Sequence, residues 1–247
     1  MQRAVRTFSL LDSLPLSVDL DLVSKPDSTL IRDWLSPSLD LSSFSFAYPT
    51  NGITEGLNYW LEEETRQIEV CRGEYQWVSG KDLGEVIYQS NPSAVDGNWK
   101  SIPTHKPVVL DCAYIGSTAL QKVEIPGNVE KVFYSFSKSF GLRNIRTGWV
   151  FSKQPMLRLQ SITCDAKYYN YVAENASKLV MDKFTLDSVH NTLVKYQLQV
   201  CKEYNFTPSD SVWLAATNDK KYDNYKRGNL NRVCIAEEIQ NLYRKSI

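Results

Sequence analysis

Short apolar runs and amphipathic stretches alternate along most of this chain. The apolar runs at 67–71, 85–89, 106–112, 131–136 and 149–152 have the length and the β-branched and aromatic content of buried strands. An amphipathic stretch at 54–64 predicts a helix before the first of these strands. Successive buried strands separated by helices or long connections are typical of an α/β fold with a mainly parallel sheet.

Both ends of the chain carry further predicted elements. Near the N-terminus, Asp27 or Ser28 can cap a helix over 26–35. After Pro155 the pattern predicts helices over 157–183 and 186–204, strands over 211–217 and 232–236, and a final helix over 237–245. We therefore expect an N-terminal segment with one helix (1–45), a large domain (46–170) and a small C-terminal domain (171–247), with the boundary between domains near 165–185.

The composition is that of an ordinary globular protein, and its formal net charge is zero. Of the 247 residues, 43% are hydrophobic and 23% charged, and the 28 basic residues balance the 28 acidic ones. A balanced charge gives no reason to expect nucleic acid or an anionic membrane as a partner. No apolar run approaches the roughly 20 residues that span a bilayer, and the apolar part of the N-terminus is too short for a signal peptide. We expect a cytoplasmic protein.

The cysteines and histidines do not indicate a metal site. Five cysteines are scattered without a Cys-x-x-Cys pair, and the two histidines are His105 and His190. We expect the thiols to be reduced. Cys112 lies in a predicted strand, where its apolar neighbours indicate a packed core thiol.

One lysine stands out because of its neighbours. Lys138 follows the apolar run 132–136, with Ser135 three residues before it, Gly141 three after it and Arg146 eight after it. A lysine among apolar groups at a strand end is desolvated, which lowers its pKa and lets its amine attack a carbonyl. The hydroxyls and the arginine suit a phosphate, and a phosphorylated aldehyde held by a lysine is pyridoxal 5′-phosphate (PLP). The alternative is a solvated lysine on an ordinary loop.

The segment Ser135-Phe-Ser-Lys-Ser-Phe-Gly-Leu-Arg-Asn-Ile-Arg-Thr-Gly-Trp149 resembles the cofactor-lysine segment of the fold-type I PLP-dependent aminotransferases, the aspartate aminotransferase superfamily. It contains the family pattern Ser-x-Ser-Lys-x-x-Gly and the arginine eight residues after the lysine. The resemblance implies a mainly parallel sheet of the seven-stranded type, flanked by helices, and a small α+β C-terminal domain. It also implies that Lys138 forms a Schiff base with PLP while Ser135 and Arg146 hold the phosphate.

The family pattern continues before the lysine. Val108-Val-Leu-Asp-Cys-Ala-Tyr114 places Asp111 at the end of an apolar strand and resembles the family motif Asp-x-Ala-Tyr. In the family the aspartate pairs with the pyridine nitrogen and keeps the ring protonated, and the tyrosine donates to the phenolic oxygen of the ring. The resemblance thus gives these roles to Asp111 and Tyr114. An aspartate that merely ends a buried strand is the alternative.

Two loops upstream resemble further parts of the cofactor site. Asn91 begins an Asn-Pro loop whose asparagine, in the family, also donates to the phenolic oxygen, although residues are inserted before its glycine. The turn that contains Gly52, Ile53 and Thr54 resembles the family's entry into a helix. Free N–H groups and the positive end of the helix dipole bind anions, so the resemblance assigns these residues to the phosphate. A capped helix without a ligand would have the same local geometry.

Two more assignments concern the cofactor face and the substrate. Tyr75, with Trp77 second, falls where the family stacks a ring on the cofactor. The segment Asn229-Leu-Asn-Arg-Val-Cys-Ile-Ala236 resembles the family's C-terminal strand, whose arginine binds the α-carboxylate of the substrate. The resemblance gives this role to Arg232, although an arginine at a sheet edge is often only solvated.

The resemblance implies an aminotransferase that moves an amino group from an amino acid to a keto acid and works as a homodimer. Lyases, decarboxylases and cyclising enzymes of the same fold, including the alliinase-like branch, use the same lysine and aspartate, so these reactions stay open. A non-catalytic relative that keeps the fold for binding or regulation is the third possibility.

Two features depart from the family. The chain is much shorter than typical members, and we find no counterpart of the N-terminal segment that sends a tyrosine to the phosphate of the neighbouring subunit. The usual dimer contacts are therefore open. The sequence does not identify the substrate either, because no excess of basic residues marks a dicarboxylate pocket.

Overall fold

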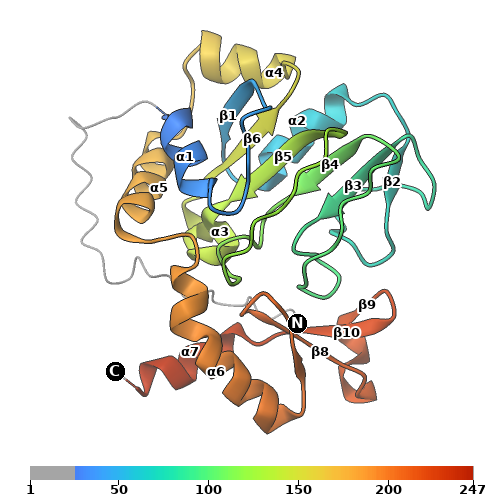
Figure 1. The fold of residues 1–247 in the computed structure, drawn as a ribbon, viewed down its shortest axis with the longest axis vertical. Coiled ribbons are helices and arrows are strands. Elements are labelled where there is room, and N and C mark those ends of the chain that lie inside the picture. The colour runs from blue at the N-terminus through green and yellow to red at the C-terminus, as the bar shows by residue number, and fades with distance from the viewer. Residues whose placement is uncertain (1–25, 247) are drawn as a thin grey trace.

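The computed structural model describes residues 26–246, which form two parts that lie one above the other in Figure 1. A six-stranded sheet with flanking helices forms the larger part, and a four-stranded sheet with two helices forms the smaller one. The N-terminal stretch that was judged too short for a signal peptide lies outside the described residues. Within them, no helix is long and apolar enough to cross a membrane.

The strands of the larger part are β1 (Phe46–Thr50), β2 (Ile68–Val70), β3 (Val86–Ser90), β4 (Val108–Asp111), β5 (Val129–Ser135) and β6 (Gly148–Ser152). Its helices and helical turns are α1 (Ser28–Leu35), α2 (Ile53–Glu63), α3 (Phe136–Ser139), η3 (Leu142–Asn144), α4 (Leu157–Leu159), η4 (Gln160–Asp165) and α5 (Tyr171–Lys183). The smaller part contains α6 (Ser188–Tyr204), β7 (Thr207–Pro208), β8 (Leu214–Thr217), η5 (Lys220–Tyr225), β9 (Lys226–Arg227), β10 (Leu230–Cys234) and α7 (Ala236–Arg244).

The large sheet has the order β1-β6-β5-β4-β3-β2. Strands β2 to β5 are parallel to one another, and β6 runs antiparallel to both of its neighbours. The predicted fold class, α/β with a mainly parallel sheet, is confirmed, although the described residues supply six strands to this sheet and not seven. Because β2 to β5 are parallel, their carboxyl ends meet at one edge, where open α/β sheets bind ligands.

Strand β1 was not predicted, and it contains Pro49, a residue that is unusual within a strand. The sheet explains how the proline is tolerated. β1 is the edge strand and pairs only with β6, opposite Trp149 at the position of the proline. A missing N–H on an edge strand removes no hydrogen bond from a central ladder.

The prediction of one long helix over 157–183 is wrong. The chain forms the short α4 and then the π-helical turn η4, leaves the helical path at Lys167 with φ 54°, and begins a new helix at α5. The side chain of Asn170 caps this new helix by accepting a hydrogen bond from the N–H of Ala173 at 3.1 Å. A polar cap competes with helix continuation, and periodicity does not detect such a break.

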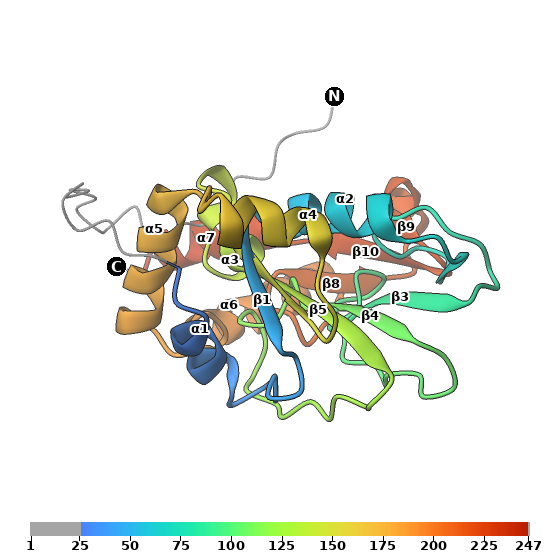
Figure 2. The same ribbon diagram turned by 90° about the horizontal axis from the view of Figure 1, so that it is seen from above.

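Helix α1 begins where the sequence predicts. The carboxylate of Asp27 accepts hydrogen bonds from the N–H groups of Thr29 and Leu30, at 2.9 and 3.1 Å. The helix then buries Ile31 and Leu35, which lie on one face at i and i+4. In Figure 2, α1 lies toward one face of the large sheet, and α2 and α4 lie on the other.

Helix α2 packs closely on the large sheet because it carries a glycine where it crosses β5 and β6. A Cβ on Gly56 would lie 2.5 Å from Cγ2 of Val150 and 3.0 Å from the Phe133 ring. The helix also buries Ile53 before this contact and Leu57 and Trp60 after it. The close approach sets the position of the helix N-terminus, which begins at Gly52 beside the carboxyl edge of the sheet.

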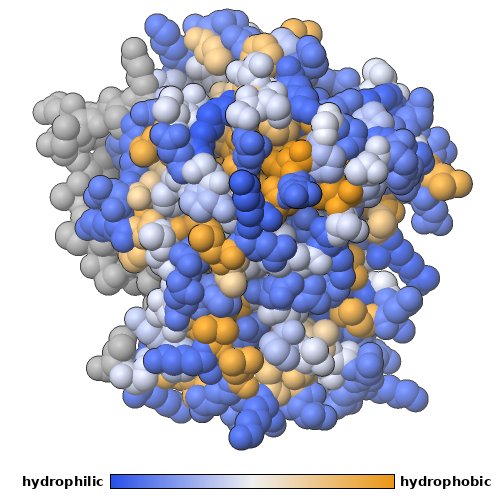
Figure 3. Space-filling view, viewed as in Figure 1, coloured by the Kyte–Doolittle hydropathy of each residue, from blue (hydrophilic) through white to orange (hydrophobic). Residues whose placement is uncertain are grey.

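The smaller part is an antiparallel sheet of order β7-β8-β10-β9 with helices α6 and α7, so the predicted small α+β part is present. Its β9–β10 hairpin contacts a loop of the larger part. A Cβ on Gly73 would lie 2.5 Å from the backbone N of Gly228, so the two backbones meet there almost directly. On the face shown in Figure 3, hydrophobic residues gather over the large sheet and hydrophilic residues cover most of the rest.

We expect Gly56→Ala to destabilise the protein by about 1–2 kcal/mol, because overpacking the contact with Val150 and Phe133 outweighs the gain in helix propensity. Chemical denaturation would measure the free energy of unfolding. Glu62→Ala, at an exposed position of the same helix, is the control and should change stability little. A Gly56→Ala variant as stable as the native protein would contradict the close packing of α2.

Candidate active site

A cavity of about 160 Å³ lies at the carboxyl edge of the large sheet. The ends of β3, β4 and β5 and the start of α2 line it from the larger part, and the β9–β10 hairpin lines it from the smaller part. The lining residues are Ile53, Thr54, Tyr75, Ser90, Ala94, Asp111, Ala113, Tyr114, Ser135, Ser137, Lys138, Arg146, Arg227 and Arg232. Most of the residues chosen from the sequence therefore meet in one place, although they span almost the whole described chain.

Lys138 lies on α3, the one-turn helix that follows β5, and its amine faces the cavity. Its Nζ donates a hydrogen bond to the hydroxyl of Tyr114 at 3.2 Å and lies 5.8 Å from the centre of the Tyr75 ring. The sequence predicts a lowered lysine pKa, and this is wrong for the cofactor-free site. The charge and hydrogen bond of Tyr114, together with the charge of Asp111, raise the pKa of Lys138 and outweigh the desolvation that lowers it.

Asp111 ends β4, and its carboxylate is buried at the base of the cavity. The hydroxyl of Tyr88 donates to Oδ2 at 2.6 Å, and the N–H of Ala113 donates to Oδ1 at 2.8 Å. Burial raises the pKa of Asp111 to about 6, although both donors favour the charged form. The carboxylate is therefore mostly ionised at neutral pH and is held in a fixed orientation. The sequence did not point to Tyr88, which has the ordinary appearance of a core aromatic.

The start of α2 and Arg146 form the end of the cavity that suits a phosphate. Helix α2 has Gly52 at its N-cap and no side chain that bonds its first N–H groups. The guanidinium of Arg146 packs on Gly52, where a Cβ would lie 3.0 Å from Nη2, and Gly52 has a φ of 83°. Only a glycine allows both this conformation and this contact. The hydroxyl of Thr54, which lines the cavity, lies 3.4 Å from that of Tyr75.

Two serines flank Lys138 in different ways. Ser135 lines the cavity as predicted, but its hydroxyl donates to the carbonyl of Thr147 at 3.0 Å and accepts from the N–H of Ser137 at 3.1 Å. The hydroxyl of Ser137 is buried, lines the same cavity and has no hydrogen-bond partner among the described residues. Ser137 is therefore the free donor on this side, and the sequence analysis did not select it.

Of the two aromatic candidates, the structure brings only Tyr75 to the cavity. The side chain of Trp77 is half exposed, and its Nε1 donates to the side chain of Asn58 at 2.8 Å. The order of preference in the sequence analysis, Tyr75 before Trp77, agrees with this geometry.

Two selected residues, Gly52 and Asn91, do not line the cavity, and Asn91 is turned into its own loop. Its side-chain amide donates to the carbonyl of Lys100 at 2.9 Å, and its oxygen accepts from the N–H of the same residue at 2.9 Å. Both polar ends thus close the loop on itself. The preceding residue, Ser90, lines the cavity instead, with its hydroxyl donated to the buried carboxylate of Glu74 at 2.5 Å. The prediction that Asn91 contacts the cofactor does not fit this structure, because the insertion in the loop gives its amide a local partner.

The smaller part contributes two arginines. Arg232, predicted as the carboxylate ligand, lines the cavity and donates through Nη1 to the carbonyl of Ala94, while its Nε is buried without a partner among the described residues. Arg227 lines the same cavity and donates through Nη1 to the backbone carbonyl of Glu74 at 3.3 Å. Arg227 was not predicted from the sequence. The available signal is Gly228-Asn229, a two-residue turn sequence that predicts a hairpin. Such a hairpin brings Arg227 opposite strand β10.

These residues fit PLP, the cofactor that the chain's resemblance implies. The unsatisfied start of α2, the free hydroxyl of Ser137 and the guanidinium of Arg146 are donors for a phosphate. The buried carboxylate of Asp111 suits a protonated pyridine nitrogen, and Lys138 supplies the amine.

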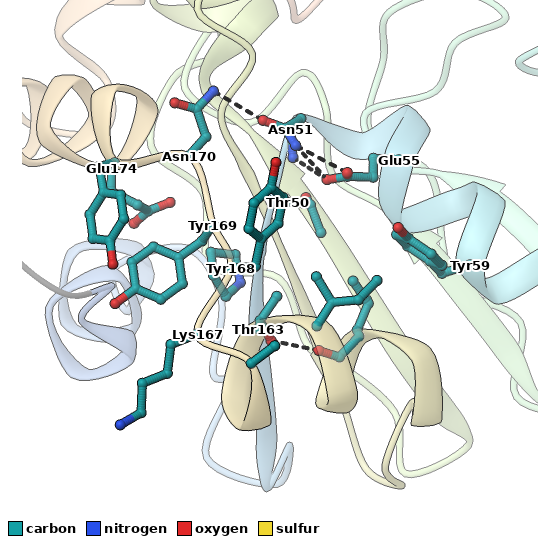
Figure 4. Close-up of a pocket in the computed structure, with 15 residues that line it drawn as sticks. Thr50, Asn51, Glu55, Tyr59, Thr163, Lys167, Tyr168, Tyr169, Asn170 and Glu174 are labelled. Carbon is teal, nitrogen blue, oxygen red and sulfur yellow. Dashed lines mark hydrogen bonds between the residues drawn. The ribbon is translucent and has the colours of Figure 1, made fainter.

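A second cavity, of about 750 Å³, is larger but lacks a comparable set of groups. It lies between the start of α2 and the segment from η4 to α5, and Figure 4 shows Glu174 beside Tyr169, with Lys167 directed away from both. Asn170 bridges the cavity by donating to the side chain of Asn51 at 3.0 Å. Burial raises the pKa of Glu174 to about 7. No lysine amine and carboxylate face each other there as Lys138 and Asp111 do, so the smaller cavity is the candidate active site.

Comparison with known proteins places the fold. No family model and no curated protein matches the chain by sequence. Solved structures match it in fold but at low identity. A tyrosine aminotransferase from Leishmania infantum matches with a TM-score of 0.66 and 10% identity, over 88% of this chain and 81% of that one.

Two further solved structures match a similar share of this chain. A histidinol-phosphate aminotransferase from Sinorhizobium meliloti, in complex with PLP, matches with a TM-score of 0.53 and 14% identity, over 90% of this chain and 84% of that one. An L-threonine-O-3-phosphate decarboxylase from Porphyromonas gingivalis matches with a TM-score of 0.59 and 14% identity, over 90% and 91%. The chain thus has the fold of the fold-type I PLP-dependent aminotransferases, as its sequence motifs indicate.

We expect Asp111→Asn to stabilise the cofactor-free protein above pH 6. The folded pKa of Asp111, about 6, lies above the ordinary value of 3.8, so its contribution to stability is complete below pH 3.8 and is lost as the pH rises through 6. The asparagine does not ionise, so the variant should be more stable at pH 7.5 by up to about 3 kcal/mol. Denaturation curves from pH 4 to 8 would measure this.

The exposed Asp33→Asn is the control, and its difference from the native protein should not grow over the same range. Added PLP should reverse the order, because a pyridinium favours the ionised Asp111. An Asp111→Asn variant whose stability difference is constant with pH would contradict the assignment.

Proposed function

We propose that this chain, which has the fold of the fold-type I PLP-dependent aminotransferases, binds PLP on Lys138 and transfers an amino group from an amino acid to a keto acid. The observation that carries the proposal is the convergence of Lys138, Asp111, Arg146 and Arg232 on one small cavity. These side chains come from different elements, and a fold kept for its shape alone gives no reason for them to meet. The likeness in shape to the solved structures supports the fold, and the geometry of the site supports the chemistry.

The cofactor supplies an electron sink for the negative charge that develops at the substrate Cα when it loses a proton. Asp111, oriented by Tyr88 and Ala113, keeps an ionised carboxylate for the ring nitrogen. The start of α2 and Arg146 bind the phosphate and fix the orientation of the ring. Tyr75 covers one face and helps to exclude water.

Lys138 carries the cofactor and then moves the substrate proton through Nζ as general acid and base. In the cofactor-free site its raised pKa keeps it an ammonium, so it must lose a proton before it attacks a carbonyl. The hydroxyl oxygen of Tyr114, 3.2 Å from Nζ, accepts a hydrogen bond from the amine and orients it toward the cavity. Arg232 binds the substrate carboxylate with the donors that the protein leaves unused, including its buried Nε.

Lys138→Ala should abolish the covalent attachment of PLP and lower turnover by about 100-fold or more, since both the attachment and the proton transfer depend on Nζ. The measurement is borohydride reduction of the PLP-loaded protein followed by mass mapping of the modified peptide. Lys122→Ala, at an exposed position, is the matched control and should be labelled like the native protein. Label on another lysine in the native protein would disprove the assignment.

An amino-donor screen then separates the reaction types. Formation of the aminated cofactor with a keto acid product supports transamination. Release of CO₂ or of a leaving group would favour the decarboxylase or lyase alternative, and one of the similar structures is a decarboxylase. No PLP adduct at all would favour a non-catalytic relative.

We further propose a cytoplasmic homodimer. The support for the compartment is that all five cysteines are free thiols, with Cys112 buried in the core as predicted. The support for the dimer is the resemblance of the site to a family whose active sites lie at a subunit interface. Sedimentation velocity of the PLP-loaded protein should give a single species of about twice the 28.3 kDa chain mass. A monomer with full activity would exclude the dimer.

A further inference from the structure

The two arginines of the smaller part project from the same face of one hairpin. Arg227 on β9 pairs with Leu230 on β10, and Arg232 lies two residues further along β10. Side chains two residues apart on a strand point to the same face, so Arg227 and Arg232 are diagonal neighbours. Both line the cavity that holds Lys138. A positive φ of 56° at Gly228 makes the two-residue turn that creates this arrangement.

Neither guanidinium has a carboxylate partner among the described residues. The ion pairs between described residues involve other side chains. The only hydrogen bonds that hold Arg227 and Arg232 there go to backbone carbonyls, those of Glu74 and Ala94. A carbonyl orients an arginine but does not neutralise it. Desolvation and the positive charge of Arg232 accordingly lower the pKa of Arg227.

The buried carboxylate of Glu74, whose charge acts on Arg227, is engaged by other groups. The carboxylate of Glu74 accepts hydrogen bonds from the hydroxyl of Ser90 at 2.5 Å and from the N–H groups of Ser90 and Tyr75 at 3.2 and 2.9 Å. It does not line the cavity. The Glu74 carboxylate therefore acts on Arg227 through its charge and does not form an ion pair with it. The guanidinium of Arg227 lines the cavity and keeps N–H groups for a ligand.

An amino acid with an uncharged side chain would not neutralise all the arginines of the site. With the cofactor bound, Arg146 and the start of α2 face the phosphate, and Asp111 faces the ring nitrogen. One α-carboxylate then neutralises Arg232, and the charge of Arg227 stays uncompensated in a partly buried position. Such a charge is costly unless a ligand brings a second anion.

We propose, on the basis of the function proposed above, that the amino acid substrate carries a second anionic group on its side chain and that Arg227 binds it while Arg232 binds the α-carboxylate. A carboxylate and a phosphate monoester share the chemistry that the guanidinium recognises. Arg227 is thus a specificity-determining residue. The sequence offered no sign of such a pocket, because the second arginine comes from a hairpin fold and not from a local excess of basic residues.

The test is calorimetric titration of the PLP-loaded protein with three unreactive acids: butyrate, succinate and 3-phosphonopropionate. The native protein should bind at least one of the two dianions about 10- to 100-fold more tightly than butyrate, the range expected for a hydrogen bond to a charged group. Arg227→Gln should remove that advantage and leave butyrate binding unchanged. Arg232→Gln should weaken all three acids.

Lys226→Gln is the matched control, since Lys226 is exposed on the same strand and its side chain points to the opposite face. It should behave as the native protein does. Equal binding of butyrate and both dianions, or a dianion advantage that survives Arg227→Gln, would overturn the proposal. A uniform loss of all three acids in Arg227→Gln would also overturn it, because that result indicates a structural role in docking the hairpin.

Steady-state kinetics with paired amino donors separates the two sources of the anion. Glutamate against glutamine tests a carboxylate, and O-phosphoserine against serine tests a phosphate. Arg227→Gln should lower kcat/KM by about 10- to 100-fold for the preferred dianionic donor and leave its neutral counterpart unchanged. If PLP labels Lys138 but neutral donors are preferred, this proposal fails and the aminotransferase proposal stands. If PLP does not label Lys138, the aminotransferase proposal has failed first.

Discussion

The buried carboxylate of Asp111 is the constraint on which the rest of the site depends. It is the one acidic side chain that lines a cavity with four cationic ones, Lys138, Arg146, Arg227 and Arg232. Burial alone would neutralise it, and the hydrogen bonds from Tyr88 and Ala113 keep it largely ionised at neutral pH. The surrounding excess of positive charge makes the cavity a receptor for anionic ligands. The pKa of Lys138 rises because Tyr114 and the charge of Asp111 outweigh desolvation and the positive charge of Arg232, both of which lower it.

Only a small part of the fold forms this site. It uses the carboxyl ends of three neighbouring strands, the start of one helix and one hairpin, and these are the parts that a parallel sheet brings to a common edge. Two close backbone contacts hold them in place. Gly56 lets α2 lie against β5 and β6, and Gly73 meets Gly228 where the hairpin docks on the loop of Tyr75. A short chain can therefore keep all these groups, provided that these contacts are preserved.

Two departures from sequence expectation at the site, those at Asn91 and Ser135, have the same cause, which is competition for hydrogen bonds within the protein. The side chain of Asn91 is hydrogen-bonded to the backbone of Lys100. The hydroxyl of Ser135 donates to the carbonyl of Thr147. The neighbours one or two residues away, Ser90 and Ser137, line the same cavity, and the hydroxyl of Ser137 is free. A family motif identifies the residue that contacts the cofactor in other members of the family. Which hydroxyl or amide is free depends on the local loop, and the loop after Asn91 differs here by an insertion.

The sequence by itself determined the mainly parallel α/β architecture and, through motifs, selected Lys138, Asp111, Tyr114 and Arg146, which line one cavity in the structure. These follow from apolar runs of strand length and from motifs in which the groups are close in sequence, so local information suffices. Tertiary structure decided the proline-containing edge strand β1, the break between α4 and α5, and the pairing of Arg227 with Arg232 on one face. It also decided the sign of the Lys138 pKa shift. Each of these depends on which distant groups become neighbours, and electrostatic energies and sheet pairing are set by distance in space and not by distance along the chain.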